Sequence, residues 1–153
     1  MKKLRFIFFV IFSTVISISA QTIEARLFDQ FGSLECENIR TILDSFLVEL
    51  QNNPQSMGYV IVYDGMHYSY DSRKWQNPVF GEATRLTQQM LQHFKFRRFP
   101  PDKYLFINGG FRENYEVELW IAPKYAKPPM PKPTVENIKY RKGKLVGIVC
   151  EDG

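Results

Sequence analysis

The sequence predicts a mixed α/β (α+β) fold in which two helices pack on one face of a single mixed sheet. Two segments, 37–50 and 82–94, repeat apolar residues at three- and four-residue steps, which is typical of amphipathic helices. Four further segments are expected to be strands: 23–31, 58–63, 103–107 and 115–121. The order β-α-β-α-β-β, with a right-handed crossover in each strand-helix-strand unit, predicts a two-layer sandwich.

The first predicted helix has one apolar stripe and clear ends. Gly32-Ser33 closes the strand before it, Glu35 and Glu37 suit the positive end of its dipole, and Asn52-Asn53-Pro54 stops it. The stripe is expected to face the core and consists of Ile39, Ile42, Leu43, Phe46, Leu47 and Leu50.

The middle of the chain combines a buried strand, a long irregular segment and the second helix. The run GYVIVY at 58–63 is expected to be buried, because it is β-branched and aromatic throughout. Residues 64–79 have no clear period and are interpreted as a polar and aromatic loop, which at that length is functional or mobile. The helix after it ends before Pro100-Pro101, because proline cannot continue a helix.

The last part of the domain is predicted to form a closing hairpin at the sheet edge. A turn is expected at Asn108-Gly109-Gly110, followed by a strictly alternating strand with one solvent-exposed face. Its core face carries Val117, Leu119 and Ile121, and its exposed face carries Glu116, Glu118 and Trp120. An extended proline-rich segment follows at 123–133, and 143–150 is a candidate last strand.

Residues 1–20 have the three regions of a secretory signal peptide: a basic start, an apolar run and a more polar stretch ending in Ser19-Ala20. Cleavage is expected after Ala20, which places the product in the periplasm or outside the cell with no membrane span. The alternative, a membrane anchor, is disfavoured because hydroxyl side chains dilute the roughly 20 apolar residues that a span needs. The predicted organisation is a signal peptide at 1–20, an α/β domain at 21–122, and a proline-rich segment with a strand or tail at 123–153.

The charge balance of the exported chain argues against nucleic acid as a partner. Lys2, Lys3 and Arg5 belong to the leader, so the other 133 residues carry 17 basic and 16 acidic side chains, a net charge of +1. Nucleic-acid binding rests on a much larger excess of positive charge.

Export also makes a disulfide between Cys36 and Cys150 the expected state of the two cysteines, which lie 114 positions apart. Closing so long a loop stabilises a fold by about 4–5 kcal/mol in the chain-entropy model. Two free buried thiols remain the alternative.

One string of residues resembles a known group of proteins. Gly109-Gly110-Phe111-Arg112-Glu113, followed by Val117-Glu118-Leu119-Trp120-Ile121-Ala122-Pro123, is similar to the G-G-x-R-E-x-x-x-V-E-L-W-I-x-P signature of uncharacterised exported bacterial proteins. The likeness covers most of residues 27–133. It implies export but no established activity.

More distantly, the order of elements is similar to that of OmpA-like domains, which bind peptidoglycan in the periplasm. In that family an aspartate after the second strand and an arginine on the second helix hold the diaminopimelate of the wall peptide. The resemblance implies these roles for Asp64 and Arg85. The threonine-aspartate motif that the family has in this loop is absent here.

The aromatic residues of 64–79 are the best candidates for recognition, since rings with polar tips give large contact areas. We expect a ligand site formed by Asp64, His67, Tyr68, Tyr70, Trp75 and Arg85. The alternative is that two or three of these rings cap the core. Metal and cofactor sites are not expected, because His67 is flanked only by Asp64 and Asp71, without repeated ligand spacing.

The sequence therefore predicts an exported, non-enzymatic binding or envelope-associated module that contacts cell-wall peptide or an envelope protein. The first alternative is a protein-interaction module that uses 123–133 as a docking strip. A hydrolase built on His67 is a remote alternative, because the G-x-S-x-G motif and a phosphate-binding glycine-rich loop are absent.

Overall fold

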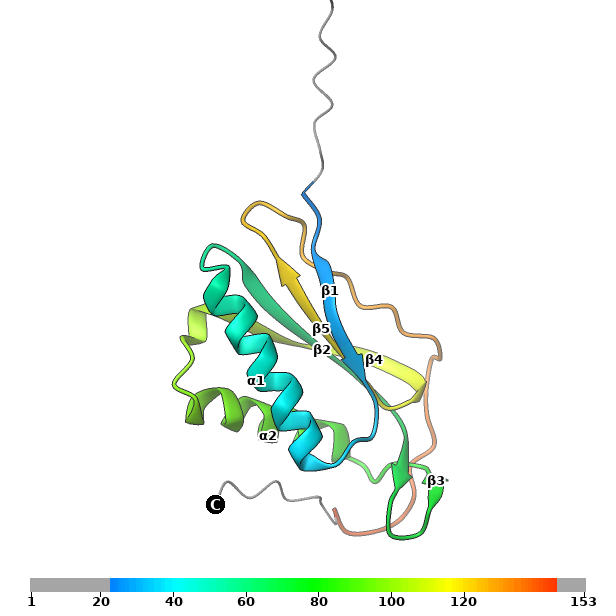
Figure 1. The fold of residues 1–153 in the computed structure, drawn as a ribbon. Coiled ribbons are helices and arrows are strands. Elements are labelled where there is room, and N and C mark those ends of the chain that lie inside the picture. Colours follow the sequence, from blue (N-terminus) through cyan, green and yellow to red (C-terminus); the bar gives the residue numbers. More distant parts are fainter. Residues whose placement is uncertain (1–22, 146–153) are drawn as a thin grey trace, which may run out of the picture.

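A five-stranded mixed sheet forms the centre of the structure (Figure 1). This computed structural model describes residues 23–145. Strand β5 lies between β1 and β2 and is antiparallel to both, while β4 is parallel to β2 on the other side of β2. Strand β3 pairs only with the last residues of β2. The strands are β1 (Arg26–Phe31), β2 (Met57–Ser69), β3 (Lys74–Gln76), β4 (Tyr104–Asn114) and β5 (Glu116–Ala122).

Two helices, α1 (Cys36–Asn52) and α2 (Glu82–Phe96), pack on the same face of this sheet (Figure 1). A short 3-10 turn, η1 (Pro101–Lys103), follows α2. The rings of Phe46 and Phe94, one from each helix, are 6.3 Å apart and fully buried. Both belong to one core with Val60 of β2 and Leu119 of β5. The predicted two-layer α+β fold is therefore confirmed.

An ion-pair cluster also joins the two helices. The Nε2 atom of His93 on α2 lies 2.7 Å from a carboxylate oxygen of Asp44 on α1, and Arg97 donates two hydrogen bonds to the same carboxylate at 2.8 and 2.5 Å. Burial would raise the pKa of Asp44, but Arg97 and His93 outweigh it and hold the pKa below its usual value. The cluster therefore joins the C-terminal end of α2 to α1.

The predicted closing hairpin is wrong, because β4 and β5 flank β2 instead of pairing with each other. The chain crosses over β2 at Tyr115, whose backbone N–H donates to the carbonyl of Met66 at 2.9 Å. A Cβ at Gly65 would lie 2.3 Å from the carbonyl carbon of Asn114. The crossing therefore requires glycine at position 65, and it makes β5 a central strand.

The predicted loop at 64–79 and turn at 108–110 are also largely strand. Strand β2 continues to Ser69 and forms a hairpin with β3, in which Tyr68 lies opposite Trp75. Strand β4 passes through the two glycines with a bulge, because Val62 pairs with Asn108 but Tyr63 pairs with Gly110. Gly110 has a φ of 84°, and the Tyr63 ring occupies the space of a Cβ at position 109.

The sheet face away from the helices is covered by the chain itself. Residues 123–135, which we call the proline strap, begin beside β1 with a bridge between Glu24 and Lys127. They end beside β4 with a bridge between Phe111 and Val135 (Figure 1). The expectation that Glu118 faces solvent is wrong for this reason, since the residue is only 8% exposed.

Several predictions concern residues outside the described part of the chain. The predicted leader at 1–20 lies there, and so does Cys150, so both the leader and the pairing of Cys36 with Cys150 stay predictions. Residues 143–145 are described and have no regular structure, while the rest of the candidate last strand lies outside. In the described range neither helix has the length and apolar character needed to cross a membrane.

Candidate functional site

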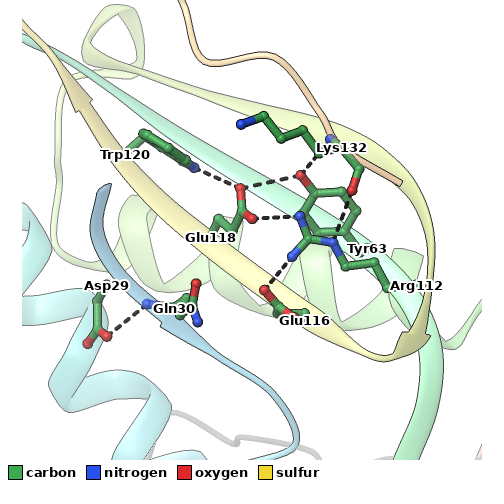
Figure 2. Close-up of polar contacts among 8 residues, drawn as sticks. All are labelled: Asp29, Gln30, Tyr63, Arg112, Glu116, Glu118, Trp120 and Lys132. Carbon is green, nitrogen blue, oxygen red and sulfur yellow. Dashed lines mark hydrogen bonds and ion pairs between the residues drawn. The ribbon is translucent and has the colours of Figure 1, made fainter. Parts of the chain in front are cut away.

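Two clusters of polar and aromatic side chains are candidates for function, and the first is centred on Arg112 beneath the proline strap (Figure 2). Its guanidinium lies 3.5 Å from the centre of the Tyr63 ring. It donates to Glu118 Oε1 at 2.7 Å, pairs with Glu116, and donates from Nε to the carbonyl of Lys132 at 3.2 Å. All three guanidinium nitrogens therefore have partners.

The second carboxylate oxygen of Glu118 completes this cluster. It accepts hydrogen bonds from the indole N–H of Trp120 at 2.9 Å and from the hydroxyl of Tyr63 at 3.3 Å. The Tyr63 oxygen in turn accepts the backbone N–H of Lys132 at 3.0 Å (Figure 2). None of these side chains has a buried polar atom without a partner.

The pKa values of the cluster agree with a closed structural network. Burial raises the pKa of the Tyr63 hydroxyl. Burial would lower the pKa of Arg112, but the Glu118 and Glu116 carboxylates outweigh it and raise the pKa. Arg112, Glu118 and Trp120 all belong to the signature string of the sequence. In the structure these three residues take part in the network that links the sheet to the strap.

The second cluster lines a cleft of about 480 Å³ at the end of the sheet where β1 and β2 finish. Its walls are the segment after β1, the end of β2 with the β2–β3 turn, and the first two turns of α2. Of the six residues predicted for a ligand site, His67, Tyr68, Tyr70 and Arg85 line this cleft.

Asp64 and Trp75 are placed outside the cleft. The Asp64 carboxylate accepts hydrogen bonds from the Tyr140 hydroxyl at 3.0 Å and from the Gly65 N–H at 2.9 Å. It faces a neighbouring hollow of about 360 Å³ that also contains Phe80. Trp75 is 51% exposed, and its ring lies 5.6 Å from that of Tyr68.

The tyrosines of the cleft are held against the segment that follows β1. The Tyr70 hydroxyl donates to the carbonyl of Ser33 at 3.0 Å, and the backbone N–H of Tyr68 donates to the Ser33 hydroxyl at 3.0 Å. The two rings meet edge to face at 5.3 Å. They form a fixed aromatic wall on one side of the opening.

His67 lies deeper than the two tyrosines, and one of its ring nitrogens lacks a hydrogen-bond partner. Its ring stacks on Tyr115 at 4.6 Å, and its Nε2 atom is buried without a hydrogen-bond partner. Burial lowers the pKa of His67, and the positive charges of Arg141 and Arg85 act in the same direction, while Glu82 and Asp64 oppose them. Burial also raises the pKa of Tyr115 well above its usual value.

Two arginines complete the cleft. Arg85 extends from α2, and its Nε is buried without a partner. Arg141 comes from the segment after the strap, where its Nε donates to the carbonyl of Asn77 at 3.0 Å and its backbone N–H donates to that of Pro78 at 2.9 Å. Sequence reasoning missed Arg141, because no local pattern indicates that the chain returns to this place.

The acidic side of the cleft was also missed. Glu82 and Asp71 line it, and one Glu82 oxygen accepts the N–H of Val79 at 2.8 Å at the start of α2. Glu82 begins the second predicted helix, and an acidic residue at a helix start is common enough that it does not by itself indicate a site. In residues 23–145 no group of three or more histidine, cysteine or acidic side chains is placed to hold a metal ion.

The cleft thus offers two guanidinium groups and an imidazole beside two carboxylates and an aromatic wall. Such a set can bind carboxylate and ammonium groups of one ligand. Comparison with known proteins found no matching family model, no similar curated protein and no similar solved structure.

Proposed function

We propose that this protein is an exported, non-enzymatic binding module whose cleft takes a peptide with free carboxylate and ammonium groups, such as a cell-wall peptide. The observation that carries the proposal is that two residues lining the cleft, His67 and Arg85, each have a buried side-chain nitrogen without a hydrogen-bond partner, Nε2 and Nε.

Buried polar atoms without partners are costly. Each leaves a desolvation penalty of about 1–3 kcal/mol, and most buried polar groups in proteins avoid it. Two such atoms in one open cleft are explained if a ligand supplies their hydrogen bonds. The Arg112 network supports this interpretation, because there the same chain satisfies every buried polar atom.

The charges of the cleft favour a ligand that carries both signs. Arg85 and Arg141 suit a carboxylate, which accepts two parallel hydrogen bonds from one guanidinium. Asp71 and Glu82 suit an ammonium group. A wall peptide with a diamino acid carries both groups, and the predicted leader would deliver the protein to the compartment that contains such peptides.

The resemblance to OmpA-like domains supports the ligand class only by analogy. Arg85 lines the cleft as that analogy requires, whereas Asp64 is occupied by Tyr140 outside it. We therefore assign the recognition of an ammonium group to Asp71 and Glu82 instead of Asp64.

The alternative role of 123–133 as a docking strip has less support. The backbone of Lys132 binds Tyr63 and Arg112 of the same chain, which favours a structural role for the strap. No observation on the cleft favours a hydrolase over a binding module.

The test is sedimentation of the purified chain, residues 21–153, with isolated cell-wall sacculi. Wild type should be recovered in the pellet, and Arg85→Ala should reduce recovery by about tenfold or more, as expected for loss of a charged hydrogen bond. Arg26→Ala is the matched control, because Arg26 pairs with Glu49 at the opposite end of the sheet and should bind as wild type does. Absence of both wild type and Arg85→Ala from the pellet would reject wall binding.

A further inference from the structure

The end of the sheet opposite the cleft forms a second distinctive surface. Ala122 lies opposite Met57, and Gly58 lies opposite Tyr104, so the segments 123–127, 53–56 and 97–103 leave the sheet at the same end. Strand β1 also begins here, with Arg26 opposite Ile121 (Figure 1). The chain therefore enters the described structure at this end.

This end carries unpaired positive charge. Four exposed cations here form no ion pair with another described residue, and we call them the basic end: Lys95, Arg98, Lys124 and Lys127. Two nearby acids are already neutralised, since Glu49 pairs with Arg26 and Asp44 pairs with Arg97. Glu24 and Asp102 remain exposed. With Glu24 and Asp102 counted, the four cations still leave an excess of two positive charges at this end, and a second exposed basic run, 139–144, lies near the cleft.

Two aromatic side chains project among these cations. Phe96 is 59% exposed and Tyr125 is 86% exposed. The Lys124 ammonium lies 5.0 Å from the centre of the Tyr125 ring, and the Arg97 guanidinium lies 5.6 Å from that of Phe96. Tyr125 also has a φ of 71°, a backbone conformation that side-chain-bearing residues rarely adopt.

We propose that the basic end docks on an anionic phospholipid surface. Protein surfaces that lie at the headgroup level of a bilayer combine lysine and arginine with exposed aromatic rings. There the cations contact lipid phosphates, and the rings enter the boundary with the acyl chains. The predicted leader joins the chain at this end, which is consequently the end nearest the membrane during export. Docking here leaves the cleft facing away from the bilayer, toward the wall.

This inference goes beyond the proposed ligand and uses only the export part of that proposal. The test is sedimentation of residues 21–153 with vesicles of phosphatidylcholine, with and without 30% phosphatidylglycerol, in the absence of cell wall. Its failure therefore leaves the wall-binding result unaffected. The protein should bind only the anionic vesicles, and added salt should weaken the binding.

The decisive variant is the double replacement Lys124→Glu with Lys127→Glu, which should weaken binding by about 25-fold or more, roughly fivefold for each positive charge removed. The control is Lys139→Glu with Lys142→Glu, which changes the net charge equally in an exposed segment near the cleft and should lose less than about threefold. Tyr125→Ser should weaken the part of binding that persists at high salt. Circular dichroism of each variant confirms that it is folded.

Three results would overturn the proposal: equal binding to neutral vesicles, equal loss in the control pair, or no binding to either vesicle. Binding to a DNA duplex as tight as that to anionic vesicles would also overturn it, because it would show a general affinity for polyanions.

Discussion

The two polar clusters of this protein contain similar kinds of side chain, but they differ in whether the hydrogen bonds of those side chains are complete. Each has a half-buried arginine among aromatic rings and carboxylates. Around Arg112 the guanidinium, the tyrosine hydroxyl and the indole all have partners within the chain. In the cleft, Nε of Arg85 and Nε2 of His67 have none. The difference separates a cluster that holds the fold together from one that is open to a ligand.

Their positions explain the difference. The Arg112 network lies on the sheet and is covered by the strap. A polar group there that lost its partner could not form a hydrogen bond with water instead. The cleft lies at the end of the sheet, between the segment after β1, the end of β2 and the start of α2. The cleft is open, so a ligand can enter it and supply hydrogen bonds that the chain does not make.

The largest effect is expected from Arg112→Ala. Removing the guanidinium leaves the Glu118 carboxylate buried without its charged partner, so the free energy of unfolding should fall by about 3–5 kcal/mol. Urea denaturation followed by circular dichroism measures it. Arg85→Ala is the matched replacement in the cleft and should cost less than about 1 kcal/mol. Equal losses in the two variants would remove the distinction between the clusters.

Gly65→Ala should have the second-largest effect on stability. The added methyl would collide with the backbone that crosses β2 between Asn114 and Tyr115, and overpacking of this kind costs about 1–3 kcal/mol. The melting temperature of the variant, compared with that of wild type, gives the result. An unchanged melting temperature would mean that the crossing is not as close as the structure has it.

Tyr63→Phe should have a smaller effect on stability. It removes the hydroxyl that joins Glu118 to the strap and leaves the N–H of Lys132 without an acceptor, at a cost of about 1–2 kcal/mol. Limited proteolysis should then cut the strap faster than in wild type. Cutting at the wild-type rate would show that the strap is held by other contacts.

The pH dependence of stability should reveal the burial of His67. Because burial lowers its pKa in the folded protein, the unfolded chain takes up a proton first as the pH falls. The free energy of unfolding should therefore be highest above about pH 6.5 and should decrease as the pH falls below that value. His67→Gln should show a smaller decrease over the same range. If the free energy of unfolding had the same dependence on pH in both proteins, the burial of His67 would be contradicted.

Much of the fold could be predicted from the sequence, because periodicity reports which side of an element is apolar. The stripe that contains Phe46 and Leu50 placed α1 correctly, and the alternation of Val117 and Leu119 placed the core side of β5. The pairing of β5 could not be predicted. Alternation defines a strand's two faces but not its neighbours, and the crossing at Gly65 has no local signal.

The two clusters were predictable to different extents. His67, Tyr68 and Tyr70 lie within a few residues of one another, so the aromatic composition of the segment was a sufficient cue. Arg141 joins them only through the path of the chain after the strap. Glu118 was expected to face solvent because neither Arg112 nor the strap could be placed beside it from the sequence.

The central claim is that the unpaired atoms of the cleft are satisfied by a ligand. Nitrogen-15 NMR of the His67 ring, recorded with increasing amounts of a soluble wall peptide, tests it most directly. A new hydrogen bond at Nε2 should shift that resonance, and a bound carboxylate should raise the pKa of His67. A ring spectrum and a pKa that stay the same at saturating peptide would contradict the claim.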